Sequence, residues 1–134
     1  HRHVGTLVHL QLEQISKFGF AFWLSEKKPD LMKRIEQSLA HLGVAGSDLS
    51  ESTEKVFDTV NKTLKSERGQ WILSQHHDHK CELSLTGVVQ GQLYHVVIDR
   101  TFVADGIRWI IDYKTSTPRA GESWPAFLRR EAEH

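Results

Sequence analysis

Apolar residues recur at helical spacing through the first half of the chain. The segment 4–17 has an apolar residue every three or four positions, and a glycine follows shortly after as a stop signal. The same spacing predicts helices at 29–43 and around 56–64, and a short helix within 67–74. Residues 1–75 are therefore predicted to be mainly helical.

The second half changes to the short alternating runs that are typical of strands. Strands are predicted at 81–89, with a turn at Gly91-Gln92, and then on either side of Asp105-Gly106. These strands form a three-stranded meander over 80–115. A proline near the start of 123–134 predicts the beginning of a C-terminal helix. The whole is predicted to be one α/β domain with a mixed β-sheet flanked by helices.

The hairpin around Asp105-Gly106 determines which side chains face each other. Both residues tolerate positive φ, which suits a two-residue type I′ turn. In that register Asp99 lies opposite Asp112, and strand alternation puts Lys114 on the same face. Like charges placed opposite each other are destabilising, so a bound cation gives this arrangement a physical reason. The other face is predicted to be core, with Val96, Ile98, Phe102, Ile107, Trp109 and Ile111.

Several chemistries use two carboxylates. A glycosidase gives no role to a lysine two residues after one acid, and an aspartic dyad relies on Gly-rich loops that are absent here. A hard divalent cation such as Mg²⁺ fits two carboxylates and keeps positions open for phosphate oxygens. The alternative is structural, because an Asp-x-Lys tripeptide is common and Asp99 could instead pair with Arg100 or Arg108 at the surface.

Several histidines, one glutamate and one arginine are further candidates for the site. His9 lies outside the apolar stripe of its helix, where it is either a solvated histidine or a group that faces a cleft. Glu82, at the start of a strand, is either a strand-edge charge or an accessory site residue. His76 to His79 form an exposed loop in this interpretation, because neighbouring loop residues rarely converge on one ion. Arg100 has either a packing role or a phosphate-binding role.

Composition sets the limits on function. Seventeen basic residues balance seventeen acidic ones in 134 residues, so no basic surplus indicates a polyanionic partner. A single cysteine excludes a disulfide framework or a four-cysteine iron–sulfur cluster within this chain, and it favours a reducing, cytoplasmic setting. The chain has no apolar run of membrane-spanning length and no phosphate-binding loop of an ATPase motor.

Together these motifs resemble a known family. The order of four motifs resembles that in nuclease domains of the RecB/AddA class of helicase–nucleases. The motifs are Gly-Thr-Leu-Val-His ending at His9, then Glu82, then Val-Ile-Asp-Arg containing Asp99, and last Ile-Asp-Tyr-Lys-Thr containing Asp112 and Lys114. That class belongs to the PD-(D/E)XK nuclease superfamily. The resemblance covers most of the chain, and the combined set is far more specific than any one motif.

The resemblance implies roles residue by residue. His9, Asp99 and Asp112 would bind the metal, and the backbone carbonyl of Tyr113 would add a ligand. Lys114 would assist the attacking water, and Asp99, Asp112 and Lys114 would be the catalytic residues. The expected cofactor is Mg²⁺, with Mn²⁺ as a substitute because a histidine ligand suits Mn²⁺ better.

The resemblance also implies a biological setting. The chain would be a fragment of an ATP-dependent helicase–nuclease and would act as an exonuclease on DNA ends during recombinational repair. Its partners would be DNA, a helicase motor in the same full-length protein and possibly a second subunit, with no membrane. Family members carry a Gln-x-x-x-Tyr motif on the next helix, and 124–134 has none. A catalytically silent domain for DNA binding or subunit assembly is therefore the alternative.

Overall fold

The computed structural model describes residues 2–113 and 126–132, of which Phe22 and 126–132 are described by their backbone alone. The helices are α1 (Arg2–Phe18), α2 (Ala21–Leu24), α3 (Lys28–Leu42), the 3₁₀ turn η1 (Gly46–Asp48), α4 (Leu49–Lys65) and α5 (Glu67–Leu73). The strands are β1 (His77–Val89), β2 (Gln92–Ala104), β3 (Ile107–Tyr113) and β4 (Ala126–Ala132).

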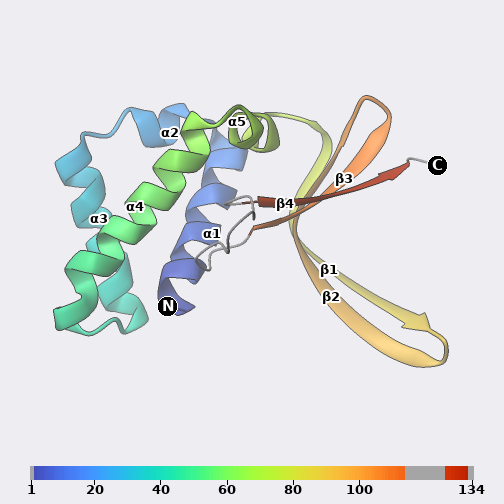
Figure 1. The fold of residues 1–134 in the computed structure, drawn as a ribbon, viewed down its shortest axis with the longest axis horizontal. Helices are drawn as coiled ribbons and strands as arrows, with labels where there is room; N and C mark the ends of the chain where they lie inside the picture. The colour runs from blue at the N-terminus through green and yellow to red at the C-terminus, as the bar shows by residue number, and fades with distance from the viewer. Residues whose placement is uncertain (1, 114–125, 133–134) are drawn as a thin grey trace, which may run out of the picture.

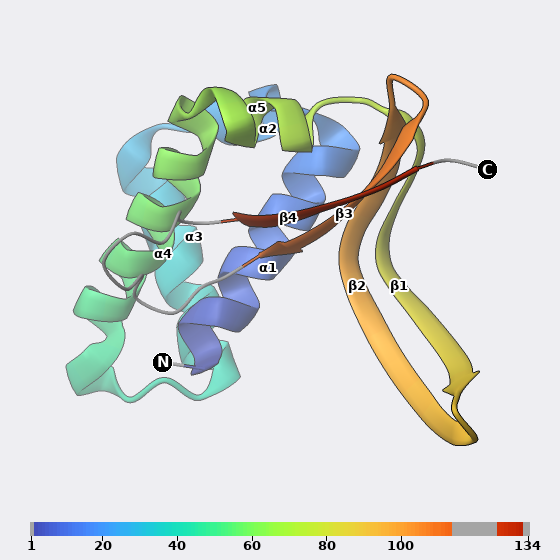
Figure 2. The same ribbon diagram turned by 45° about the vertical axis from the view of Figure 1, so that its right-hand side comes forward.

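The strands form one sheet in the order β1-β2-β3-β4, and every pairing is antiparallel. In Figures 1 and 2 the helices lie together on one side of this sheet. The predicted combination of helices and a β-sheet is confirmed, and so is the antiparallel meander of β1, β2 and β3. The prediction of a mixed sheet is wrong for the described strands. Within the described ranges, no helix is both long and apolar enough to cross a membrane.

Local chemistry sets the ends of the helices. Pro29 occupies the first turn of α3, where its missing N–H is not needed. Gly43 ends the same helix with φ of 102°, a left-handed conformation that glycine adopts without steric cost. At α5, the Ser66 hydroxyl accepts a hydrogen bond from the Gly69 amide at 2.9 Å. A Cβ on Gly69 would lie 1.9 Å from the carbonyl oxygen of Thr63, so only glycine lets α5 begin so close to α4.

The core joins the helical layer to the base of the sheet. Each fully buried Leu, Ile or Phe side chain contributes about 1.5–3 kcal/mol relative to its exposed state. The predicted apolar stripe of α1 is buried, as are those of α3 and α4. From the sheet only the residues nearest the helices join the cluster, which includes Leu12, Ile15, Ile35, Leu39, Val56, Val60, Ile72, Phe102 and Ile111.

The β2–β3 hairpin has the predicted turn. Asp105 and Gly106 both have positive φ, 54° and 71°, as a type I′ turn requires. Ala104 pairs with Ile107, and the register continues without a bulge to Arg100 and Ile111. The turn between β1 and β2 is shifted by one residue from the prediction. It is formed by Gln90 and Gly91, which both have positive φ, and Gln92 already belongs to β2.

Three further predictions are corrected. Residues 126–132 are a strand rather than a helix, because the free edge of β3 provides backbone partners that local helix propensity does not outweigh. His77 to His79 begin β1 rather than forming a loop. Val96 is about half exposed, because β1 and β2 extend beyond the helices that would cover it.

Arg100 is the most unusual core residue, because its long cationic side chain is completely buried. Its Nε donates to the carbonyl oxygen of Ile72 at 2.8 Å, and Nη2 donates to that of Ser74 at 2.9 Å. The remaining nitrogen, Nη1, lies 3.6 Å from the Cys81 sulfur. The guanidinium thus satisfies carbonyls at the end of α5 and links this helix to β2. Of the two roles considered for Arg100, the structure supports packing.

Arg100→Met is expected to lower the free energy of unfolding by about 2–4 kcal/mol, because two buried carbonyls would lose their donors while side-chain volume is largely kept. Urea unfolding followed by circular dichroism measures the loss. Arg108→Met is the matched control. It removes an ion pair with Asp78 and a 3.3 Å hydrogen bond to the Thr101 hydroxyl, neither of which involves a buried carbonyl, so its loss should be smaller. Equal effects of the two substitutions would contradict the anchoring role of Arg100.

Candidate metal centre

Three elements bring their residues together at one point. His9 comes from α1, Asp99 from β2 and Tyr113 from the end of β3. The His9 Nδ1 atom lies 3.4 Å from Asp99 Oδ1, and Nε2 lies 3.1 Å from the Tyr113 carbonyl oxygen. The Tyr113 amide donates to Asp99 Oδ2 at 2.8 Å. Residues some ninety to one hundred positions apart in sequence therefore form one connected network.

Asp112 joins this network from β3. The paired register ends at Arg100 opposite Ile111, and one further step in the same register puts Asp99 beside Asp112. The Asp112 side chain lies close enough to Asp99 to help lower the pKa of the Asp99 carboxyl group. Asp112 is exposed to solvent, whereas the Asp99 side chain is only 14% exposed. The centre thus has one largely buried acid, Asp99, and one solvent-exposed acid, Asp112.

The network favours the charged form of His9. The hydrogen bond to Asp99 raises the pKa of the imidazole above its usual 6.5, and it outweighs the opposing effect of partial burial. The negative charge of Asp99, the carbonyl of Tyr113 and the charge of Asp112 raise it further. Both ring nitrogens face oxygen acceptors, so the doubly protonated imidazolium suits this geometry in the metal-free protein.

Asp99 is held as a carboxylate. Burial alone would raise its pKa, but the hydrogen bonds from His9 and from the Tyr113 amide, with a smaller contribution of the Asp112 side chain, lower it below its usual value. Tyr113 provides these contacts through its backbone, while its ring is buried and stands edge-on to the His9 ring, with 5.7 Å between centroids. The side chain of Tyr113 packs, and its peptide group provides the polar contacts.

The donor set can be tested against a divalent cation. Carboxylate and carbonyl oxygens suit Mg²⁺ and Mn²⁺, and a neutral imidazole suits Mn²⁺. The two ring nitrogens of His9 face Asp99 Oδ1 and the Tyr113 carbonyl oxygen, which are oxygen atoms of the kind that bind such cations. The residues therefore fit a cation: His9 would lose the proton of one ring nitrogen and bind through that nitrogen as a neutral imidazole. Among the described residues, no three His, Cys, Asp or Glu side chains are already grouped as a metal site.

Two further residues are predicted for the site, Lys114 and Glu82. Lys114 lies outside the described residues. Glu82 is exposed and has φ of 54°, a left-handed conformation that costs free energy for a residue with a side chain. It lies between Cys81, which pairs with Arg100, and Leu83, which pairs with Ile98, and is therefore level with Asp99. The pKa of Lys17 on α1 is raised mainly by its hydrogen bond to Glu13, and the charge of Glu82 adds a small further rise.

The remaining histidine candidates have other partners. His76 stacks on Phe102 with 3.9 Å between ring centroids and is edge-on to Trp71. His77 and His79 are exposed at the start of β1. Sequence reasoning missed the double role of the Tyr113 peptide, whose amide holds Asp99 while its carbonyl contacts His9. Backbone contacts of this kind leave no signal in residue types.

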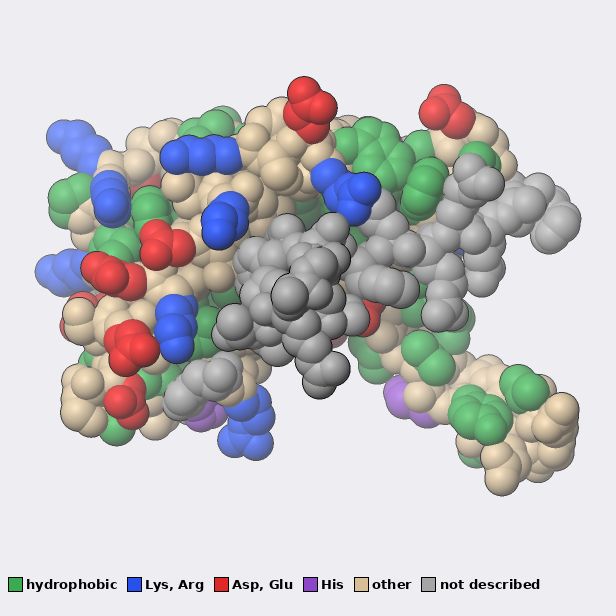
Figure 3. All heavy atoms as spheres, viewed as in Figure 1, with side chains coloured by type: hydrophobic (Ala, Val, Ile, Leu, Met, Phe, Trp, Pro, Cys, Tyr) green, Lys and Arg blue, Asp and Glu red, His purple; other side chains and the backbone are tan. Residues whose placement is uncertain are grey.

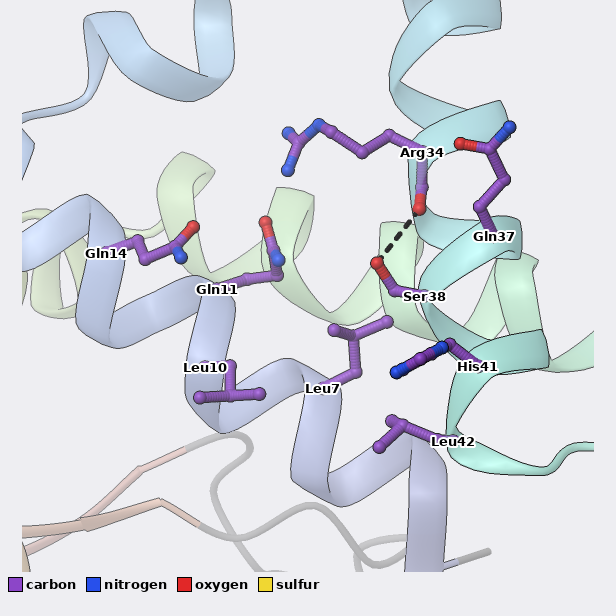
Figure 4. A pocket seen from close by; sticks show the side chains of 9 residues that line it. All are labelled: Leu7, Leu10, Gln11, Gln14, Arg34, Gln37, Ser38, His41 and Leu42. Carbon is purple, nitrogen blue, oxygen red and sulfur yellow. Dashed lines mark hydrogen bonds between the residues drawn. The ribbon is translucent and has the colours of Figure 1, made fainter.

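A pocket of about 450 Å³ lies between α1 and α3 (Figure 4). Gln11 and Gln14 from α1 and Arg34 from α3 line one part of it, and Leu7 and His41 line another. The Gln11 side chain is buried, and its Oε1 has no hydrogen-bond partner among the described residues. Residues two apart on a helix project about 200° apart, so Gln11 and His9 lie on opposite sides of α1. The pocket is therefore separate from the candidate metal centre.

In the metal-free protein, His9 is expected to titrate above pH 6.5 because Asp99 stabilises its charged form. A pKa raised by folding stabilises the protein fully below about pH 6.5, and this contribution is lost as the pH rises through the folded-state pKa. An NMR titration of the His9 ring measures the value. In Asp99→Asn the His9 pKa should fall, and an unchanged value would mean that Asp99 does not control His9.

Comparisons with known proteins found no relative that could add to this geometry. No family model matches the chain, and no curated protein or solved structure matches it. The family resemblance therefore depends on the order and spacing of motifs in the sequence. The contacts of His9 with Asp99 and Tyr113, next to Asp112, are the structural support for a function.

Proposed function

We propose that this chain is a metal-dependent DNA nuclease domain that hydrolyses phosphodiester bonds. The observation that carries the proposal is the contact of His9 with both Asp99 and the Tyr113 carbonyl, next to a second acid, Asp112. The resemblance extends the proposal to a PD-(D/E)XK core and to exonuclease action in DNA-end processing and recombinational repair. It also implies a DNA substrate and an ATP-driven helicase motor in the full-length protein.

Four groups of the chain would hold the ion. They are the His9 imidazole, the carboxylates of Asp99 and Asp112, and the carbonyl oxygen of Tyr113. Asp99 is already ionised and is oriented by the Tyr113 amide, so little reorganisation of this ligand is needed. Asp112 is exposed, which leaves an approach for a phosphate group from solvent.

The proposed site residues have different roles in hydrolysis. When bound, a divalent ion polarises the phosphate and lowers the pKa of a water molecule. The role implied for Lys114 is to orient the attacking water and to neutralise charge that develops on the phosphate. Partial burial of Asp99 and His9 strengthens their electrostatic interactions, because the local dielectric constant is lower than in water.

The histidine ligand bears on the choice of metal. Imidazole is a softer ligand than carboxylate and binds Mn²⁺ more readily than Mg²⁺. Mn²⁺ is therefore expected to support activity at least as well as Mg²⁺. Activity with Mg²⁺ but none with Mn²⁺ would argue against His9 as a ligand.

A second candidate function is a catalytically silent nuclease-like domain that binds DNA or supports a partner subunit. One observation favours it. The described residues contain no ready-made group of three metal-binding side chains. A protein that binds metal but does not cleave DNA would favour this alternative. So would a protein that neither binds metal nor cleaves DNA.

Calorimetric titration with MnCl₂ tests the metal site directly. Wild-type protein should bind about one equivalent, and Asp112→Asn should weaken binding at least tenfold because it removes one charged ligand. Asp105→Asn is the matched control, since it removes a carboxylate at the turn of the same hairpin and asparagine tolerates positive φ. Identical binding by all three proteins would exclude a site at Asp112.

Cleavage of linear single- and double-stranded DNA with Mn²⁺ tests the proposed activity. Lys114→Ala should lower the rate by about 10²-fold or more if Lys114 stabilises the transition state. Lys65→Ala removes an exposed lysine from the last turn of α4 and should cleave like the wild type. Equal rates for Lys114→Ala and wild type would refute the assigned mechanism, whereas Mn²⁺ binding without cleavage would support the silent domain.

A further inference from the structure

The far part of the β1–β2 hairpin extends away from the rest of the molecule. This arm, residues 83–98, is two-stranded, and Figures 1 and 2 show it projecting past the helices. Seven of the ten exposed large apolar residues of the described chain lie on it: Leu85, Val88, Val89, Leu93, Tyr94, Val96 and Val97. An isolated two-stranded hairpin is at best marginally stable in water, so the exposed arm lacks the packing that such a ribbon normally needs.

The two faces of the arm differ in polarity. Strand alternation and the observed register give one face most of the apolar side chains. This apolar face consists of Leu83, Leu85, Gly87, Val89, Gln92, Tyr94, Val96 and Ile98. The opposite, mixed face carries Ser84, Thr86 and His95 beside three exposed apolar residues, Val88, Leu93 and Val97. The Thr86 hydroxyl lies 3.1 Å from His95 Nδ1 in the middle of that face. The apolar face has Gln92 and the Tyr94 hydroxyl as its only polar side-chain groups, so it is the more continuous apolar surface of the two.

The apolar face continues the buried row of β2. Arg100 and Phe102 occupy alternate positions of this strand and are fully buried under the helices. Two and four positions before Arg100, Ile98 is half-buried and Val96 is 51% exposed. The side chains of this row thus change from buried to exposed at the point where the helical layer ends.

The arm has no charged side chains, and this limits which kinds of partner can cover it. Residues 83–98 contain no Asp, Glu, Lys or Arg, although a quarter of the whole chain is charged. Figure 3 shows the end of the arm without blue or red side chains. A nucleic acid needs Lys or Arg to neutralise its phosphates, so it does not suit this surface. Two identical uncharged surfaces, in contrast, meet without like-charge repulsion, and the net charge of zero for the whole chain adds none.

We propose that the apolar face of the arm packs against the same face of a second copy of this chain. Two-fold symmetric pairing of identical patches is the commonest arrangement of homo-oligomers, and it closes at two copies. Two such ribbons packed face to face form a small sandwich with sheets about 10 Å apart. Leu85 and Val96, which are directly paired in the middle of the face, lie in its centre.

Paired lysine substitutions on the two faces test this proposal. Leu85→Lys with Val96→Lys places two charges on the apolar face, and Thr86→Lys with His95→Lys places two charges on the mixed face one position away. Both pairs are directly opposed in the register, so the variants are matched in charge, location and hairpin pairing. Sedimentation velocity over a concentration series measures the dimerisation constant.

The wild type should reach the mass of a dimer and no more. The apolar-face variant should dimerise at least tenfold more weakly, while the mixed-face variant should keep the wild-type constant. Both should keep the wild-type circular dichroism spectrum, because the arm lies outside the core, and Val89→Lys alone provides a milder test. A wild type that stays monomeric, that grows beyond two copies, or that responds equally to both pairs would overturn the proposal.

Discussion

The buried guanidinium of Arg100 fixes how the helical layer and the sheet meet. It donates to carbonyls at the end of α5 and approaches the sulfur of Cys81 on β1. A buried cation without a carboxylate partner would be costly, but these acceptors at the end of a helix carry partial negative charge. Because its donors have fixed directions, the guanidinium sets both the depth and the rotation of β2 at this level.

The candidate metal centre depends on that placement. Asp99 immediately precedes Arg100, so the anchored strand leaves it little freedom to move. The type I′ turn then sets the register that brings Asp112 and the Tyr113 peptide beside it. α1 adds His9 only because its apolar stripe is buried on another side. Three separate constraints, one buried cation, one turn and one amphipathic helix, converge on a few polar atoms.

Sequence reasoning succeeded where the determinants are local. The Asp-Gly turn and the stripe of α1 depend on neighbouring residues, and both have the predicted form. It failed where the structure of a segment is determined by an element that is distant in the sequence. The pairing of 126–132 with β3 depends on a free strand edge, and the exposure of Val96 depends on where the helices end. The contacts of Arg100 involve two elements that its own sequence surroundings do not indicate, which is why its role stayed open until the structure was known.

The arm and the candidate centre share the strand β2, and the boundary between them is narrow. Ile98 belongs to the arm, Asp99 contacts His9, and Arg100 is the buried anchor. On the neighbouring strand, Glu82 has a left-handed backbone at the same level, so the ribbon is irregular where it leaves the core. Covering the arm would restrict motion of β2 on one side of Asp99, while Arg100 already restricts it on the other. Covering the arm should therefore limit how far Asp99 can move relative to His9, even though no arm residue belongs to the centre.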